Sequence, residues 1–150
     1  MFEREVADRA EIRDLACRNE IRDLAFRYAR AVDRRDWALA RFLFTEDAVL
    51  VAARFELVGV ERILRGLGSV ERYRATFHAV HNQTLEIAGD AATGETYCVA
   101  NHLLERDGRS FKLDWGIRYQ DRYRRGLDGA WRFARRELIV DWEQELPLSS

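Results

Sequence analysis

Between residues 111 and 123, large apolar side chains alternate with polar or small ones. The apolar set is Phe111, Leu113, Trp115, Ile117, Tyr119 and Tyr123, and the positions between them carry Lys112, Asp114, Gly116, Arg118, Gln120 and Arg122. A period of two places successive side chains on opposite faces of a β-strand. We therefore predict a strand with one apolar and one solvated face, which is typical of an antiparallel sheet.

Several other stretches after residue 45 fit the same sheet. Turns are predicted at Gly89-Asp90, Arg106-Asp107-Gly108 and Leu127-Asp128-Gly129, because glycine and aspartate favour tight turns. Thr45-Glu46-Asp47 is expected to open a further turn, and Pro147 lies in an expected tail over 144–150. The remaining strands are predicted over 48–53, 55–58, 76–87, 96–105 and 131–142.

The N-terminal third is predicted to be helical and contains a near repeat. EIRDLACR at 11–18 recurs as EIRDLAFR at 20–27, an offset of nine residues. Nine residues turn an α-helix by about half a revolution, so the two copies would face opposite ways in one straight helix. The second copy continues the better apolar stripe, which favours 20–33 as the docked helix. Residues 1–19 are then either an extra segment that bends at Arg18-Asn19 or packs on a partner chain, or the exposed start of one long helix.

Two shorter helices are expected before the sheet. Asp36 is predicted to cap a helix over 37–44 whose Trp37, Phe42 and Leu43 pack inward, and a third helix covers 60–64 with Gly66 and Gly68 ending it. Helices followed by an antiparallel meander indicate the α+β class. The length of 150 residues fits one domain over 1–150.

Composition excludes several classes of protein. The net charge is −1 with acids and bases interspersed, so nothing indicates nucleic-acid binding. The charged N-terminus is no signal peptide, and no apolar run has the roughly 20 residues that a membrane helix needs. Cys17 and Cys98 are isolated, which predicts a reduced cytoplasmic protein without disulfides. The 3 histidines are scattered among strands and predict no metal site.

Two polar residues stand out from their surroundings. Asp33 is placed at the end of a helix, where the helix dipole disfavours an acid. His78 lies among Phe77, Ala79 and Val80. Each has an ordinary interpretation: Asp33 as a surface acid paired with a neighbouring arginine, and His78 as a hydrogen-bonded core residue. If the two are paired, His78 becomes a candidate general base.

Three motifs resemble the SnoaL-like branch of the nuclear transport factor 2-like superfamily. They are RYARAVDRRDW at 27–37, HAVHN at 78–82 ahead of Gly89-Asp90, and YQDRYRR at 119–125 with DGAWRFARRELIVDW at 128–142. That branch includes scytalone dehydratase, bile-acid 7α-dehydratase and hexachlorocyclohexane dehydrochlorinase. The resemblance covers about residues 20–143. It implies a cone-shaped α+β barrel, in which a curved antiparallel sheet wraps around a deep pocket closed by the helices.

The resemblance also implies a site. Asp33 matches the aspartate that pairs with a strand histidine in the eliminating members, and His78 matches that histidine. Tyr28 matches the pocket tyrosine of the dehydratases, and Arg136 matches a pocket arginine of the dehydrochlorinase. In a cone, part of the core-facing side becomes pocket wall, so the expected substrate-binding residues also include His102, Tyr73, Trp115, Ile117, Tyr119, Leu138 and Val140, although most such residues are core.

This set predicts proton abstraction without a cofactor or metal. His78 would act as the base, Asp33 would fix its tautomer, Tyr28 would donate a hydrogen bond, and Arg136 would stabilise developing negative charge. A hydrophobic cyclic, polyketide- or steroid-like molecule fits the expected apolar wall. The leading interpretation is a dehydratase-like lyase. The alternatives are an isomerase or cyclase, or a non-catalytic binding module such as the small subunit of a ring-hydroxylating dioxygenase.

Self-association is the last expectation from the sequence. Trp131, Phe133 and Ile139 are expected on the outward face of the last strand, where they would form an unusual apolar patch. A homodimer or homotrimer formed through that face would cover them.

Overall fold

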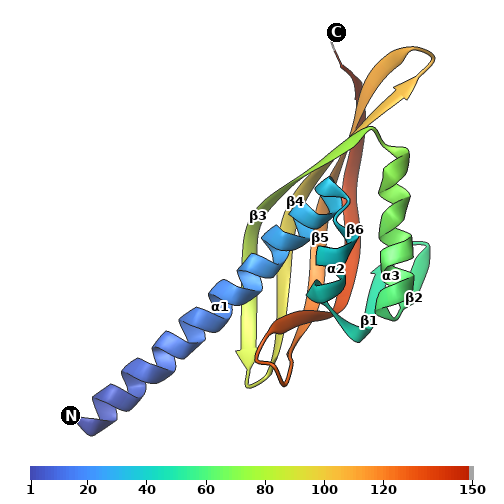
Figure 1. Cartoon of the computed structure of the whole chain (residues 1–150). Coiled ribbons are helices and arrows are strands. Elements are labelled where there is room, and N and C mark those ends of the chain that lie inside the picture. The colour runs from blue at the N-terminus through green and yellow to red at the C-terminus, as the bar shows by residue number, and fades with distance from the viewer. Residues whose placement is uncertain (149–150) are drawn as a thin grey trace.

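The computed structural model describes residues 1–148, with the side chains of residues 2 and 3 excepted. Helices and strands follow one another as α1 (Phe2–Arg34), α2 (Trp37–Leu43), β1 (Phe44–Ala52), β2 (Phe55–Val58), α3 (Val60–Leu67), the 3-10 helix η1 (Gly68–Arg72), β3 (Ala75–Ala88), β4 (Ala91–Arg106), β5 (Arg109–Arg125) and β6 (Trp131–Pro147). The strands form one curved, open sheet, and the helices pack on one face of it (Figure 1). This is the predicted cone-shaped α+β architecture.

The sheet is mixed rather than purely antiparallel. Its order is β2-β1-β6-β5-β4-β3, and the four long strands β3 to β6 form the predicted antiparallel meander. The exception is β1, which pairs parallel to β6. β1 follows α1 and α2 in the chain and lies at the edge of the meander, beside its last strand, β6. Because β1 and β6 are far apart in the sequence, local turn motifs could not predict that they pair in parallel.

The last strand is longer than expected. Residues 144–147 were expected in a tail, but they continue β6, and Pro147 is paired with Phe111 at its end. Proline is tolerated there because a strand end has little need of its missing N–H. Thr45-Glu46-Asp47 likewise belongs to β1 and does not open a turn. Of the expected tail, residues 149 and 150 lie outside the described part of the chain.

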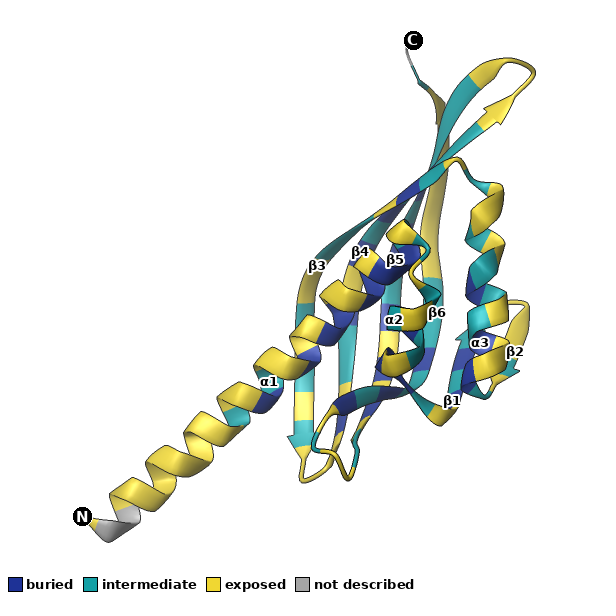
Figure 2. Cartoon of the chain, in the orientation of Figure 1, coloured by how far each residue is buried: buried dark blue, intermediate teal, exposed yellow. Residues whose placement is uncertain are grey.

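The repeat at the N-terminus lies in one continuous helix, with no bend at Arg18-Asn19. In the second copy, Ile21 and Leu24 are 0% and 3% exposed. Their counterparts in the first copy, Ile12 and Leu15, are 65% and 59% exposed. The half-turn between the copies explains the difference, and the start of α1 extends beyond the sheet (Figure 2).

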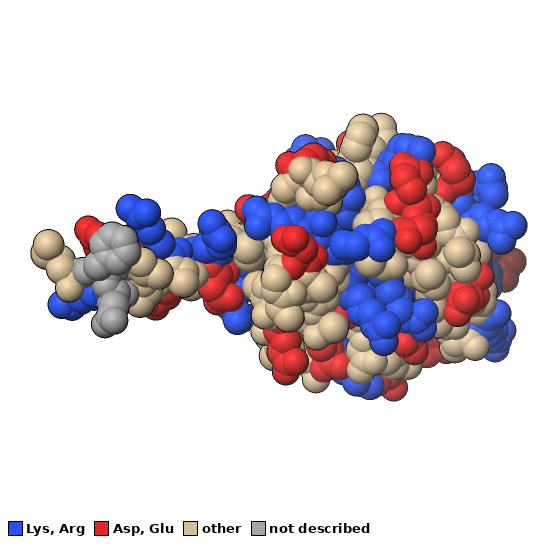
Figure 3. All heavy atoms as spheres, turned by 90° about the horizontal axis from the view of Figure 1, so that it is seen from below, with Lys and Arg blue, Asp and Glu red and all other residues tan. Residues whose placement is uncertain are grey.

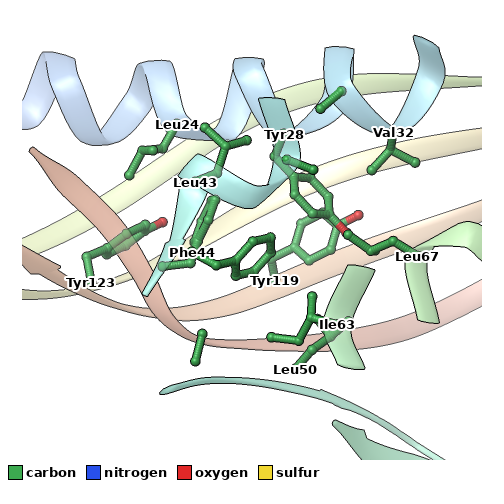
Figure 4. Packing of buried hydrophobic residues seen from close by; sticks show 14 of the residues in the cluster. Leu24, Tyr28, Val32, Leu43, Phe44, Leu50, Ile63, Leu67, Tyr119 and Tyr123 are labelled. Atoms are coloured by element: carbon green, nitrogen blue, oxygen red, sulfur yellow. The ribbon is translucent and has the colours of Figure 1, made fainter. Parts of the chain in front are cut away.

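The core lies between α1 and the inner face of the sheet. Tyr28 of α1 packs edge-on against Phe44, Tyr119 and Phe133, with ring centroids 5.9–6.1 Å apart (Figure 4). The placement of Phe133 and Trp131 corrects an expectation. Both were expected to face outward, but they are 0% and 3% exposed, since a register shift in β6 between the partners of Arg122 and Tyr123 interrupts simple alternation.

The short helix α2 begins as predicted, with Asp36 accepting a hydrogen bond from the backbone N–H of Leu39 at 2.9 Å. Leu43 is buried and Trp37 is half-buried, but Phe42 is 65% exposed and does not pack inward. In a helix of 7 residues, Phe42 and Leu43 are adjacent and cannot share a face.

The surface carries no strongly charged face in the view of Figure 3, where positive and negative side chains are interspersed. Within the described residues, no helix has the length and apolar character needed to cross a membrane.

Candidate functional site

Asp33 and His78 are in direct contact. Asp33 lies in the last turn of α1 and His78 lies on the edge strand β3, facing the helix. The Nδ1 atom of His78 lies 2.6 Å from Oδ1 of Asp33, and the backbone N–H of His78 donates to Oδ2 at 2.9 Å. The side chains are 7% and 20% exposed for His78 and Asp33 respectively. The structure therefore joins the two residues that the resemblance singled out.

The contacts define the ionisation of Asp33. Burial alone would raise the pKa of Asp33, but hydrogen bonds from the side chain and backbone of His78 and from Thr76 outweigh it and lower that pKa. Asp33 is thus a carboxylate at neutral pH and can only accept hydrogen bonds. The proton between the two groups therefore belongs to Nδ1 of His78, and in the neutral ring Nε2 keeps its lone pair. This is the tautomer that a general base needs.

Thr76 was missed by the sequence analysis. It is 7% exposed and lies two positions before His78, so both side chains share a face of β3. Its hydroxyl donates to Oδ1 of Asp33 at 2.9 Å. Strand alternation around His78 was the signal that could have identified it.

Arg35 was also missed, although it directly follows α1. It caps the helix in a left-handed conformation with a φ of 55°, which is unusual outside glycine. Its Nη1 donates to Oγ1 of Thr76 at 2.7 Å, and Nη2 donates to the carbonyl oxygen of Val70 at 3.1 Å. Because arginine only donates, the Thr76 oxygen must accept, which directs its proton toward Asp33. Arg35 thus ties the end of α1 to η1 and β3.

A narrow cavity lies on the inner side of His78. Tyr28, Cys98, Tyr119 and Arg136 contribute to its wall, and it is too narrow to hold a water molecule. Burial raises the pKa of Tyr28, so its phenol is protonated at neutral pH and can donate a hydrogen bond. Burial also raises the pKa of the Cys98 thiol to about 12, which makes it a poor nucleophile.

Arg136 is bound within the core. Its Nε and Nη2 donate to the two carboxylate oxygens of Asp121 at 2.8 and 2.9 Å, and both side chains are almost fully buried. The guanidinium carbon lies 3.9 Å from the Tyr119 ring centroid and 4.3 Å from that of Tyr28. Burial alone would lower the pKa of Arg136, but the Asp121 carboxylate raises it. Asp121 was not anticipated, because on the sequence it is one acid in a run of charged residues.

His102 belongs to an aromatic cluster beside His78. Its ring packs on Trp115 and Tyr73, with centroids 4.4 and 4.6 Å apart, and lies 6.3 Å from the ring of His78. Burial lowers the pKa of His102, so the ring is neutral at physiological pH. Its Nδ1 lies 3.1 Å from the carbonyl oxygen of Leu113, which can only accept, so Nδ1 carries the proton. The indole N–H of Trp115 is buried without a hydrogen-bond partner among the described residues.

A family model described as the SnoaL-like domain matches residues 13–137. The chain therefore belongs to the SnoaL-like family. No curated protein matches it.

Solved structures show the same fold for this SnoaL-like protein. A putative scytalone dehydratase from Novosphingobium aromaticivorans is 23% identical, with a TM-score of 0.78 over 91% of this chain and 92% of that one. Hexachlorocyclohexane dehydrochlorinase LinA-type3 from Novosphingobium barchaimii is also 23% identical, with a TM-score of 0.78 over 93% and 94%. A nuclear transport factor 2-like superfamily protein from Salmonella enterica is 16% identical, with a TM-score of 0.73 over 81% and 89%.

The remaining residues that were expected to line the pocket of the SnoaL-like domain differ from one another in how deeply they are buried. Ile117 and Tyr119 are buried in the core, at 2% and 3% exposure. Leu138 is half-buried against the core, and Val140 is 39% exposed. Of these four, only Tyr119 lines the narrow cavity beside His78. Their contact with a substrate stays a prediction.

The described residues contain no group of three or more histidine, cysteine, aspartate or glutamate side chains that could hold a metal ion. His81, which was left out of the expected site, is exposed at a register shift of β3. The candidate site of this SnoaL-like protein is an oriented imidazole beside a carboxylate, with a phenol nearby, and such an arrangement has the chemistry to accept a proton.

Proposed function

We propose that the chain is a cofactor-independent lyase in which His78 removes a proton from carbon. The observation that carries the proposal is the 2.6 Å contact between Nδ1 of His78 and Asp33, whose carboxylate also accepts hydrogen bonds from Thr76 and the His78 backbone. Asp33 holds the ring in the basic tautomer and stabilises the imidazolium that forms. The dehydratase and dehydrochlorinase among the structural neighbours support this reaction class.

In the proposed step, Nε2 of His78 takes a proton from a carbon next to an electron-withdrawing group. The electron pair of that C–H bond becomes a carbon–carbon double bond, and the leaving group departs from the adjacent carbon with its own bonding pair. A departing hydroxyl takes up a proton from the phenol of Tyr28 and leaves as water. The phenolate is then reprotonated and the His78 imidazolium releases its proton, both by exchange with solvent, so that the two side chains end neutral. The Nε2 of His102 and the indole N–H of Trp115 supply an acceptor and a donor for polar groups of the substrate.

An isomerase or cyclase would use the same first step. It would return the proton to another carbon or close a ring, in place of expelling a leaving group. A binding module or dioxygenase small subunit would need none of the Asp33, His78 and Thr76 contacts, and their presence favours an enzyme.

Deuterium incorporation tests the proposal before the substrate is known. The protein would be incubated in D2O with a panel of cyclic ketones, β-hydroxy ketones and hydrophobic acids, and products would be read by mass spectrometry. We expect a mass gain from C–H exchange or a loss of water, absent with His78→Ala. A panel that includes close analogues of the family's known substrates and yields neither change would favour the binding module.

We also propose that the chain self-associates as a homodimer or homotrimer through the outer face of the sheet. Strand register places Ala79, Val99, Gly116 and Trp142 in one row across four strands, and Trp142 is 49% exposed. A second copy of the chain would cover this row. Light scattering at micromolar concentration should give a mass above the monomer for the wild type and a lower mass for Trp142→Lys. A monomer for both proteins would contradict it.

A further inference from the structure

A second hollow reaches the Asp33–His78 pair from outside. It is a groove between α1 and β3 of about 430 Å³, and its lining includes Phe26, Arg30 and Arg34 of α1 and Phe77, His78 and Val80 of β3. Its volume is in the range of ligand-binding pockets. Ala29, His78 and Val80 line both this groove and the narrow inner cavity, so the two hollows share these walls.

The groove is positively charged. Arg30 and Arg34 are exposed and lie one helical turn apart, a spacing at which like charges repel. Neither forms an ion pair with any carboxylate among the side chains that the structure describes. The acid in the groove lining is Asp33, whose oxygens already accept hydrogen bonds from Thr76 and His78. The two guanidinium groups are therefore not neutralised by a carboxylate of the described side chains and are available to pair with an anion in the groove.

The groove also carries exposed aromatic surface. Phe26 is 49% exposed on the α1 side of the groove, whereas Phe77, which is 65% exposed, adjoins His78 on β3 and so points to the opposite face of that strand. Ala29 lies about one turn after Phe26 on α1, and its small side chain leaves room for a flat ligand.

We propose that this groove binds a small organic anion with a flat apolar body. A carboxylate or sulfonate would pair with Arg30 and Arg34, and the apolar body would lie against Phe26, next to His78. As the entry site of the substrate, the groove rests on the proposed function and narrows the substrate class to a hydrophobic acid. As a binding site for an anion, the groove is argued only from its volume and its lining residues, and this part does not depend on the proposed function.

Two probes of similar shape, one charged and one uncharged, show how much the negative charge of the ligand contributes to binding. Isotope-labelled protein would be titrated with 1-naphthoate and with the uncharged 1-naphthamide, and resonance shifts would be followed by NMR. We expect naphthoate to shift the resonances of Phe26 and His78, and naphthamide to bind about tenfold more weakly or worse. Equal affinity for the two probes, or shifts confined to other residues, would overturn the proposal.

A matched pair of double variants locates the cations. Arg30→Gln with Arg34→Gln removes the two groove charges, and Arg22→Gln with Arg27→Gln removes two exposed charges of the same helix outside the groove. The first pair should raise the Kd for naphthoate about tenfold or more, and the second should leave it within about twofold. If both double variants weaken the binding of naphthoate equally, the effect comes from the net charge of the protein, and the assignment of Arg30 and Arg34 as the binding cations is overturned.

The binding test and the activity test can fail separately. If naphthoate binds in the groove but the protein shows no C–H exchange activity, the binding site is supported and the proposed function is overturned. If the protein exchanges protons of uncharged ketones but does not bind naphthoate, the proposed function is supported and the proposal that the groove binds an anion is overturned.

Discussion

Replacing Asp33 with asparagine is expected to lower kcat about 100- to 10,000-fold in a protein that remains folded. The amide group cannot stabilise an imidazolium, and its N–H₂ end would favour the wrong tautomer of His78. His78→Ala should lose about as much activity, and the double variant should lose little more, because the two groups act as one unit. The measurement is kcat on the substrate identified by deuterium exchange, with the thermal midpoint recorded for each variant.

Thr76→Val is the graded control for this prediction. It removes one hydrogen bond to Asp33 but leaves both bonds from His78, so we expect a loss of about tenfold or less, whereas Thr76→Ser should retain the hydroxyl and most of the activity. Multiplicative losses in the Asp33 and His78 double variant would contradict a coupled pair. Wild-type activity in His78→Ala would contradict the mechanism itself.

Asp121→Asn is expected to lower the free energy of unfolding by about 3–5 kcal/mol, which corresponds to a drop of roughly 10 °C in the thermal midpoint. The side chains of Asp121 and Arg136 are 0% and 1% exposed, and arginine cannot lose its proton. The substitution therefore leaves an uncompensated charge in the core. Thermal and urea unfolding would measure the loss.

The chain contains a matched control on its surface. Asp141 and Arg118 form the same two-bond pair, at 2.6 and 2.8 Å, but on the outer face of the sheet, where their side chains are 40% and 30% exposed. Asp141→Asn should therefore change the midpoint little. Replacing the buried pair together, as Asp121→Leu with Arg136→Met, should recover much of the stability that Asp121→Asn loses. Equal destabilisation by Asp121→Asn and Asp141→Asn would contradict the role of burial.

Local periodicity determined the elements of this protein. The alternation from Phe111 to Tyr123 predicted a strand that the structure contains within β5. The nine-residue offset of the repeat predicted that its copies face opposite ways in a straight helix, and Ile21 is buried whereas Ile12 is exposed. These features were predictable because the periods of helices and strands follow from backbone geometry, which acts between near neighbours.

The pairing of Asp33 with His78 came from a family resemblance, because 45 residues separate them and no local pattern connects them. The structure then supplied the contact distance that the resemblance lacked. The bulge in β6 similarly decided that Trp131 and Phe133 face the core, since one extra residue reverses the alternation.

Only the tertiary structure determined the partners of the polar groups. Arg35 reaches Thr76 from the end of α1, Arg136 binds Asp121 directly opposite it on the neighbouring strand, and β1 joins β6 in parallel. Each of these contacts depends on register and helix placement, which arise from packing the whole chain at once. The same packing exposes the Arg30 and Arg34 side chains beside His78, so the groove is a property of the assembled fold, although every residue in it is visible in the sequence.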